Sequence, residues 1–126
     1  MLKYFDSEVG MCGGLTLLSK KDRTEGFFTN LQTLDWIFLQ AAASGSCHLG
    51  MPVSILGNNF AFRRIAYEEI GGFKQSGFSV TEDKKLMQAI HQTKKWRIVY
   101  PLHRETVIYS KPVDNINEFY SQRKRW

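Results

Sequence analysis

Apolar residues follow two different periods along the chain, one typical of strands and one typical of helices. Residues 7–19 (SEVGMCGGLTLLS) form an apolar run that predicts a buried strand, in which Gly13 and Gly14 indicate a bend or a close approach of the backbone. In residues 23–45, apolar side chains recur every three or four positions, which predicts an amphipathic helix ended by Ser44-Gly45-Ser46. The side chains expected on its buried face are Phe27, Leu31, Leu34, Phe38 and Ala41.

The rest of the chain alternates short strands and helices, which predicts an α/β fold. We find no repeat, low-complexity tract or linker, so we expect one domain. Because the strands are few and the first residues resemble the last turn of a helix, we expect that domain to be a piece of a larger fold. The expected elements are a helical turn over 1–6, a strand over 53–64 that Gly57-Asn58-Asn59 interrupts, a helix over 64–70, a helix within 76–93 that starts at Ser79 or Thr81, a helix over 114–126, and strands over 96–100 and 105–112.

The composition supports a folded domain and leaves its partners open. The 126 residues are 43% hydrophobic and 13% aromatic, which is enough for a core. The net charge of +5 fits nucleic acid, an anionic membrane surface or phosphate-bearing small molecules. No stretch reaches the roughly 18 apolar residues of a membrane span, and the start lacks the apolar core of a signal peptide. We therefore expect the chain itself to be soluble.

No set of residues in the sequence predicts a metal site. Cys12 and Cys47 do not form a CxxC pair; two buried thiols in a reducing compartment are favoured, and a disulfide between them stays open. Asp6-Ser7-Glu8 predicts a polar turn rather than a carboxylate pair for a metal. The three histidines are scattered without ligand spacing, at His48, His91 and His103.

Three stretches contain residues that suit chemistry, and the first is Thr81-Glu82-Asp83. Both acids lie in the expected first turn of a helix, where carboxylates interact favourably with the helix dipole. Taken alone, this stretch is better explained as a helix start with Thr81 or Ser79 as its N-cap. The dipole also stabilises the charged carboxylate, so a general base here needs burial or a nearby acceptor hydroxyl.

The second stretch is residues 57–64, GNNFAFRR. A Gly-Asn-Asn turn violates the pattern of a core strand, and such violations are commonest where function requires them. Asparagine side chains both donate and accept hydrogen bonds, as sugar hydroxyls require. Arg63 and Arg64 point in different directions, so at most one of them meets a phosphate. A surface turn followed by a helix start is the simpler interpretation of this stretch alone.

The third stretch is residues 119–126, FYSQRKRW. At helical spacing Gln122, Arg125 and Trp126 share one face, whereas Arg123 and Lys124 turn away toward solvent. The shared face combines an amide, a guanidinium for phosphate oxygens and an indole on which a sugar ring can stack. A solvated basic helix end that complements the helix dipole explains the same spacing equally well.

Taken in order, these stretches resemble the family 2 glycosyltransferases, especially the processive, membrane-associated branch that includes cellulose and hyaluronan synthases. The resemblance rests on GNNFAFRR, IGGF, TED, a tryptophan before a strand, and the closing QxxRW, and it covers nearly the whole chain. No single motif is specific, but the ordered set is. The resemblance implies a GT-A fold, with a mixed sheet flanked by helices, of which residues 1–126 are the acceptor-side half.

The resemblance also implies a role for each candidate residue. Asp83 becomes the catalytic base that deprotonates the acceptor hydroxyl, and Glu82 and Thr81 shape its pocket. Residues of QxxRW hold the acceptor and the donor diphosphate, and the Gly-Asn-Asn turn lines the acceptor path. The residues expected to bind acceptor or donor are Thr81, Gly57, Asn58, Asn59, Arg64, Gln122, Arg125 and Trp126.

The implied reaction is inverting transfer from a nucleotide-diphosphate sugar, expected to be a UDP-sugar, to a saccharide or lipid-linked acceptor. The enzyme would be a hexosyltransferase of polysaccharide or glycolipid biosynthesis at the cytoplasmic face of the cell membrane, attached by segments outside this chain. A divalent cation (Mg or Mn) is expected, held by a DxD motif in a nucleotide-binding half that this chain lacks. We therefore assign no metal ligand here, and we expect residues 1–126 alone to be inactive.

Two other functions stay open at this point. The first is a basic module that binds nucleic acid, although its basic residues are dispersed over several elements and form no known signature. The second is an inert fragment that folds but lacks the donor site. The basic residues available to a nucleic acid are Arg63, Arg64, Arg97, Arg123, Lys124 and Arg125.

Overall fold

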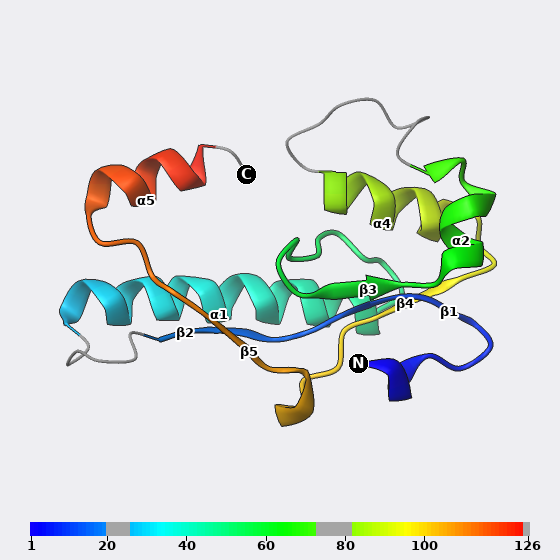
Figure 1. The fold of residues 1–126 in the computed structure, drawn as a ribbon, viewed down its shortest axis with the longest axis horizontal. Helices are drawn as coiled ribbons and strands as arrows, with labels where there is room; N and C mark the ends of the chain where they lie inside the picture. Colours follow the sequence, from blue (N-terminus) through cyan, green and yellow to red (C-terminus); the bar gives the residue numbers. More distant parts are fainter. Residues whose placement is uncertain (20–25, 73–81, 125–126) are drawn as a thin grey trace.

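The structure, a computed structural model, describes residues 1–19, 26–72 and 82–124 (Figure 1). Strands and helices alternate along these segments. The elements are η1 (Leu2–Tyr4), β1 (Val9–Gly13), β2 (Thr16–Leu18), α1 (Phe27–His48), β3 (Phe60–Phe62), α2 (Arg64–Glu69), α4 (Glu82–Gln92), β4 (Arg97–Val99), η2 (Arg104–Thr106), β5 (Ile108–Ser110) and α5 (Ile116–Arg123).

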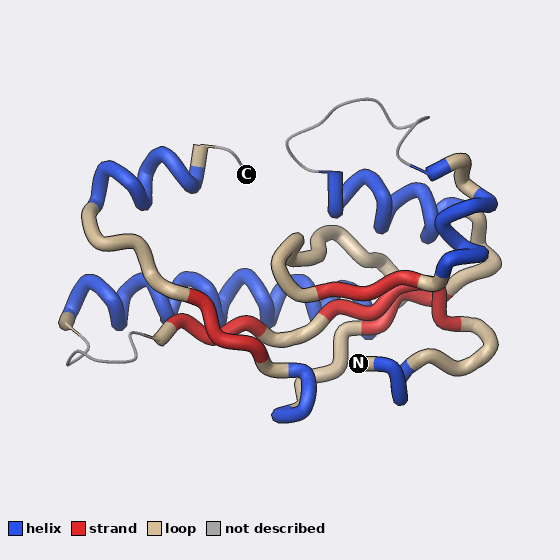
Figure 2. Tube along the Cα trace, viewed as in Figure 1, coloured by secondary structure: helices blue, strands red, loops and turns tan. Residues whose placement is uncertain are grey.

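The strands form two small sheets, drawn in red in Figure 2. In the first sheet, β1 lies between β3 and β4, antiparallel to β3 and parallel to β4, so that Met11 is opposite both Phe62 and Ile98. In the second, β2 and β5 run parallel, with Thr16 opposite Ile108. Helices α1 and α4 both contact β4. The predicted class, an α/β fold with a mixed sheet flanked by helices, is confirmed.

Gly13 and Gly14 allow a close approach of the backbone, as their sequence context predicts. A Cβ atom at Gly13 would lie 2.5 Å from Cδ2 of Tyr100, and one at Gly14 would lie 2.7 Å from Nδ2 of Asn59. Both distances are shorter than a van der Waals contact. The end of β1 therefore packs directly on an aromatic ring and on the turn that precedes β3.

The prediction of a strand over residues 53–64 is wrong in its first half. Only Phe60–Phe62 pair with β1. The reason is the turn at residues 57–59, where the N–H of Asn59 donates to the carbonyl of Leu56 at 3.2 Å and the carbonyl of Asn59 accepts from Gly14 at 2.9 Å. These bonds hold residues 56–59 in a turn beside β1, outside the sheet.

Helix α1 forms in the predicted region, but the prediction that Ser44-Gly45-Ser46 ends it is wrong, because the helix continues through these residues to His48. The face opposite to the predicted one is buried. Phe27, Leu34 and Phe38, expected in the core, are 85%, 66% and 70% exposed. Trp36, Ala43 and Cys47 are buried instead, beside the polar residues Thr29, Gln32, Gln40 and Ser44. Apolar residues recur at helical spacing on both faces, so the period alone could not select one. No helix in residues 1–19, 26–72 and 82–124 is long and apolar enough to cross a membrane.

Two buried glutamines explain the orientation of α1. Gln40 accepts from the N–H of Thr16 at 2.6 Å and donates to the carbonyl of the same residue at 2.8 Å. Gln32 makes the same pair of bonds with Val113, at 3.1 and 3.0 Å. Each glutamine amide thus pairs with both backbone groups of one residue, as a neighbouring strand would. The inward face of α1 therefore satisfies backbone groups that apolar side chains would leave unpaired.

The end of α2 and the start of α5 follow local signals in the sequence. Gly71 and Gly72, just beyond α2, have φ angles of 75° and 61°, the left-handed backbone that favours glycine. At the start of α5, Asn115 Oδ1 accepts from the N–H of Glu118 at 2.9 Å, and the Glu118 carboxylate accepts from Asn115 Nδ2 at 2.9 Å. This reciprocal capping confirms the predicted Asp/Asn start of the last helix.

Both cysteines are reduced and buried, which agrees with the favoured interpretation of two core thiols. Burial raises the pKa of Cys12 and of Cys47 to about 11. Both thiols are therefore protonated at neutral pH, which makes them poor nucleophiles and poor metal ligands.

Candidate active site

The predicted general base, Asp83, lies in the first turn of α4. Leu86, Met87 and Ile90 bury one side of this helix, as the sequence predicts, and fix its position against β1 and β4. Asp83 is half-buried and Glu82 is exposed. One carboxylate oxygen of Asp83, Oδ1, accepts from the N–H of Lys84 at 2.8 Å. The helix start therefore holds the carboxylate in place.

The second oxygen of Asp83 faces the glycine of the Gly-Asn-Asn turn. A Cβ atom at Gly57 would lie 2.5 Å from Asp83 Oδ2 and 3.2 Å from its Cγ. The two stretches, 26 positions apart in the sequence, are therefore in contact. Within the described segments Oδ2 accepts no hydrogen bond.

The two asparagines of the turn are used differently. Asn59 is buried, and its amide nitrogen donates to the carbonyls of Leu15 and Thr106 at 2.6 and 2.8 Å. Asn58 is exposed, and its Oδ1 accepts from Thr16 Oγ1 at 3.1 Å. Asn59 therefore fixes the turn, whereas Asn58 is exposed at the surface. A role for either in binding an acceptor stays a prediction.

Thr16 is a supporting residue that the sequence did not suggest. Its hydroxyl holds Asn58, and its backbone is held by Gln40 of α1. It lies 42 positions from Asn58. No local pattern connects residues that far apart, so only the fold could show this link.

Arg64 lies beyond the far end of β3 from the turn, as the order of the elements requires (Figure 1). Its Nε donates to Oε1 of Glu68 at 2.7 Å, in a pair four residues apart on α2. Its neighbour Arg63 donates from Nε to the carbonyl of Val9 at 2.9 Å. The two arginines do point in different directions, as predicted. The structure does not bring Arg64 to Asp83.

Gln122 lies on α5, the helix whose C-terminal end points toward the start of α4 in Figure 1. It is half-buried and lines a hollow of about 330 Å³ with Val113, Asn117, Glu118 and Ser121. The other predicted site residues, Thr81, Arg125 and Trp126, lie outside the described residues. The predicted shared face of Gln122, Arg125 and Trp126 is therefore neither confirmed nor contradicted.

Arg123 corrects the prediction of a solvated basic face on α5. Its guanidinium forms an ion pair with Asp35 of α1 and lies 5.6 Å from the ring of Trp36 and 4.7 Å from that of Phe119. This ion pair and these cation–π contacts anchor α5 on α1. Spacing shows which residues share a face but not which face meets the protein. Lys124, by contrast, is exposed as predicted.

The chain belongs to the glycosyl transferase family group 2, whose model matches residues 2–126. The match thus includes Asp83, the Gly-Asn-Asn turn and Gln122. No curated protein and no solved structure is similar enough to the chain to count as a match. The family therefore establishes the kind of reaction, glycosyl transfer from a nucleotide sugar, and leaves donor and acceptor open.

The divalent cation that such transferases generally use does not fit the residues described. Among them, no group of three or more His, Cys, Asp or Glu side chains could hold a metal ion. Asp6 Oδ1 accepts from the N–H groups of Glu8 and Val9 at 2.9 and 3.1 Å, and its Oδ2 accepts from Arg97 at 2.6 Å. Asp6-Ser7-Glu8 is therefore the polar turn that was predicted.

The contact between Gly57 and Asp83 predicts the effect of a single methyl group. We expect Gly57→Ala to displace the Asp83 carboxylate and to lower kcat at least tenfold, because small misplacements of reacting groups have large effects. The free energy of unfolding should change by less than about 1 kcal/mol, since Gly57 is exposed and is not at positive φ. Gly45→Ala is the control, because a Cβ there meets nothing within 4 Å. Unchanged kcat in Gly57→Ala would contradict the contact's role.

Proposed function

We propose that the chain is the acceptor-side part of a GT-A domain that transfers a sugar, with inversion, from a UDP-sugar to a saccharide or lipid-linked acceptor. The observation that carries the proposal is the Asp83 carboxylate, held by the start of α4 with Oδ2 directed at Gly57. The family match over residues 2–126 supplies the reaction class. The finer assignment to the processive, membrane-associated branch rests on the ordered motifs alone.

In the proposed step, an acceptor hydroxyl lies beside Gly57 and donates its hydrogen bond to Asp83 Oδ2. The hydroxyl oxygen attacks the anomeric carbon of the donor, the bond from that carbon to the diphosphate breaks, and the proton moves to Oδ2. Glu82 and Thr81 shape this pocket, and Gln122, Arg125 and Trp126 hold the acceptor and the diphosphate. Positive charge from Arg125 helps the diphosphate to leave.

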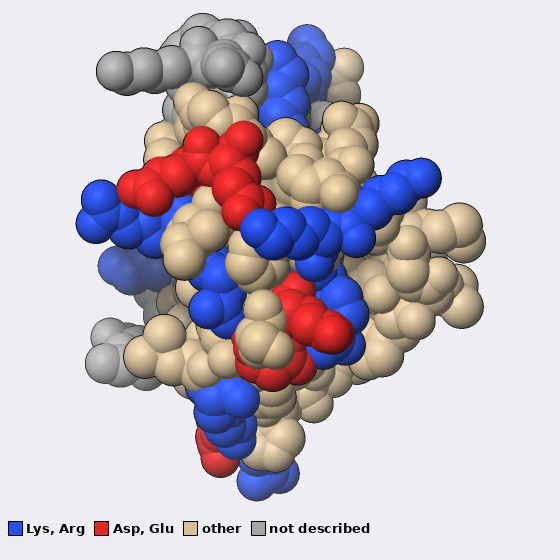
Figure 3. All heavy atoms as spheres, turned by 90° about the vertical axis from the view of Figure 1, so that its right-hand side faces the viewer, with Lys and Arg blue, Asp and Glu red and all other residues tan. Residues whose placement is uncertain are grey.

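Three arginines of the described segments support this proposal over nucleic-acid binding. Arg64 pairs with Glu68, Arg97 with Asp6 and Glu8, and Arg123 with Asp35, so these charges are already compensated. Figure 3 shows acidic and basic side chains interspersed on the face that it displays. A duplex is bound by a stripe of one sign, which this face does not offer.

The proposal is tested by a transfer assay with labelled UDP-sugars and a panel of saccharide and lipid-linked acceptors. We expect a labelled product whose anomeric configuration, read by NMR, is opposite to that of the donor. Retention of configuration would contradict the single-displacement step. Salt-dependent binding of random-sequence DNA without any sugar transfer would favour the nucleic-acid function instead.

A further inference from the structure

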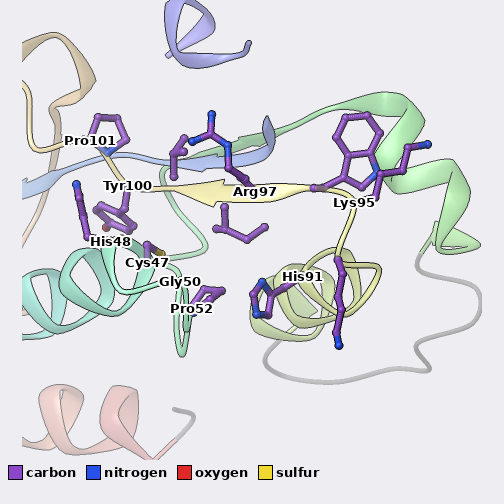
Figure 4. A pocket seen from close by; sticks show the side chains of 13 residues that line it. Cys47, His48, Gly50, Pro52, His91, Lys95, Arg97, Tyr100 and Pro101 are labelled. Atoms are coloured by element: carbon purple, nitrogen blue, oxygen red, sulfur yellow. The ribbon is translucent and has the colours of Figure 1, made fainter. Parts of the chain in front are cut away.

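The outward face of α1 carries a stripe of apolar and small residues that nothing in the described segments covers. Its members recur at alternating steps of four and three positions, the heptad spacing of a helix that packs along another helix. None of them lines the hollow of about 640 Å³ along β4, which Cys47 on the inward face of α1 borders (Figure 4). The stripe therefore offers a packing surface rather than a pocket for a small molecule. The six residues of this outer stripe, all exposed, are Phe27, Leu31, Leu34, Phe38, Ala41 and Gly45.

The apolar area exposed on this face is large enough for an interface. A phenylalanine buries about 150–250 Å², so Phe27 and Phe38, at 85% and 70% exposed, together offer about 300 Å². Leu31, Leu34 and Ile37, each about half to two thirds exposed, raise the apolar area to roughly 450 Å². Two such faces in contact would bury about 900 Å² of apolar surface, and their polar neighbours would bring the total past the roughly 1,000 Å² of a specific interface.

The side chains of the outer stripe decrease in size along the helix. The four large ones occupy its N-terminal part, and Ala41 and Gly45 occupy its C-terminal part. Two copies of α1 in parallel would place large ends against each other and leave a gap between the small ends. In an antiparallel pair, the large end of one helix meets the small end of the other. The stripe is therefore complementary to itself under a two-fold axis, as an interface between identical subunits requires.

The described residues give no reason for a glycine at position 45. Gly45 lies inside α1 and is not at positive φ, so alanine would be more favourable there. A Cβ atom at this position would meet nothing within 4 Å. Glycine allows another group to approach the backbone closely. The missing side chain is explained if a large residue of a second copy lies over it.

The charges of α1 favour a protein partner over a lipid surface. Helices that lie on a membrane carry Lys and Arg beside their apolar face. Helix α1 contains neither, and its one carboxylate, Asp35, is paired with Arg123 of α5. An anionic membrane would therefore gain no electrostatic attraction from this helix.

We propose that α1 pairs with α1 of a second copy of the chain, antiparallel and along the outer stripe. With the two-fold axis beside position 36, Phe27 faces Gly45 of the second copy, and Leu34 faces Phe38 of the second copy. These contacts extend over 18 positions, about 27 Å of helix. None of the residues assigned to glycosyl transfer lies on α1, so the pairing does not rest on the proposed function.

Sedimentation velocity over a dilution series of residues 1–126 tests the pairing. We expect a dimer that dissociates on dilution, because an interface of this size is at the lower limit for a stable complex. Leu34→Glu should raise the Kd of the dimer at least about a hundredfold, since it would bury an unpaired carboxylate. Ile65→Glu makes a matched change at an exposed position of α2 and should leave the Kd unchanged. A chain that stays monomeric at every concentration would overturn the proposal, as would equal effects of the two variants.

Gly45→Leu tests the antiparallel arrangement and separates association from folding. Leucine is the better helix former, so the Tm of the monomer should not fall. The Kd should nevertheless rise at least about tenfold, because leucine would occupy the space of Phe27 of the second copy. A tighter dimer would overturn the antiparallel pairing, since it would mean that the small ends face each other.

Vesicles of phosphatidylcholine and phosphatidylserine test the alternative occupant of the outer stripe. We expect residues 1–126 to remain in the supernatant when the vesicles are sedimented. Binding to the vesicles that Leu34→Glu abolishes, by a chain that does not dimerise, would overturn the proposal in favour of a lipid surface. None of these measurements involves sugar transfer, so their outcome is independent of the glycosyltransferase proposal.

Discussion

Asp83→Asn is expected to lower the turnover of glycosyl transfer by about 10²- to 10⁴-fold, the usual contribution of a general base. Asparagine keeps the size of the side chain and its bond to the N–H of Lys84, but it cannot take the acceptor proton. Donor binding should change little, because the carboxylate faces the turn at Gly57. The measurement is steady-state kinetics with saturating UDP-sugar and varied acceptor.

Glu82→Gln is the comparison that separates chemistry from charge. It removes one negative charge from the same helix turn, so both variants lose a similar stabilising interaction with the helix dipole, about 0.3–1 kcal/mol. Glu82 is exposed and does not face Gly57, so we expect its kcat to fall by less than tenfold. Equal kinetic losses in the two variants would mean that the helix start, and not a proton acceptor, is required.

Local signals in the sequence predicted the parts of the fold that depend on neighbouring residues. Helix α4 shows this, since its acidic start and the spacing of Leu86, Met87 and Ile90 are visible in one window. The cap at Asn115 and Glu118 is another local feature. In each case the residues that interact are within a few positions of one another, so the local sequence pattern is enough to predict the contact.

Long-range placement could not be read in this way. The contact of Gly57 with Asp83, which makes the candidate site, joins a turn to the start of α4 through the packing of that helix on the sheet. The motif order suggested that both stretches act together, but nothing in their spacing gives a distance. Arg123 was predicted to face solvent, but it contacts the protein. Its partners Asp35 and Trp36 lie on a helix nearly 90 positions earlier, so helical spacing within α5 could not indicate them.

The outward apolar face of α1 also results from contacts between residues far apart in the sequence. Phe27, Leu34 and Phe38 were expected to be buried because moving apolar side chains out of water is favourable. The chain instead buries Gln32 and Gln40, because the edge of β2 and the segment after β5 present backbone groups that need partners. Leaving such a group buried and unpaired costs about 1–3 kcal/mol, comparable to burying one large apolar side chain.

This balance predicts a large loss of stability from Gln40→Leu, a change that adds apolar surface to the core. Thr16 is fully buried, so its N–H and carbonyl would both lose their partner and could not reach water. We expect the free energy of unfolding to fall by about 2–4 kcal/mol, measured by urea titration. Because the Thr16 hydroxyl also holds Asn58, we expect transfer activity to fall as the turn loosens.

Two matched substitutions set the scale for this loss. Gln32→Leu removes a similar pair of hydrogen bonds to a backbone. Val113 is only half-buried, however, and water can replace the amide, so we expect about half the loss in the free energy of unfolding. Gln88→Leu makes the same chemical change at an exposed position of α4 and should stay within about 0.5 kcal/mol of the unaltered protein. If Gln40→Leu and Gln88→Leu were equally stable, backbone pairing could not be what turns the apolar face of α1 outward. The loss is expected to be larger for Gln40 than for Gln32 because the Thr16 backbone is shielded from water more completely than that of Val113.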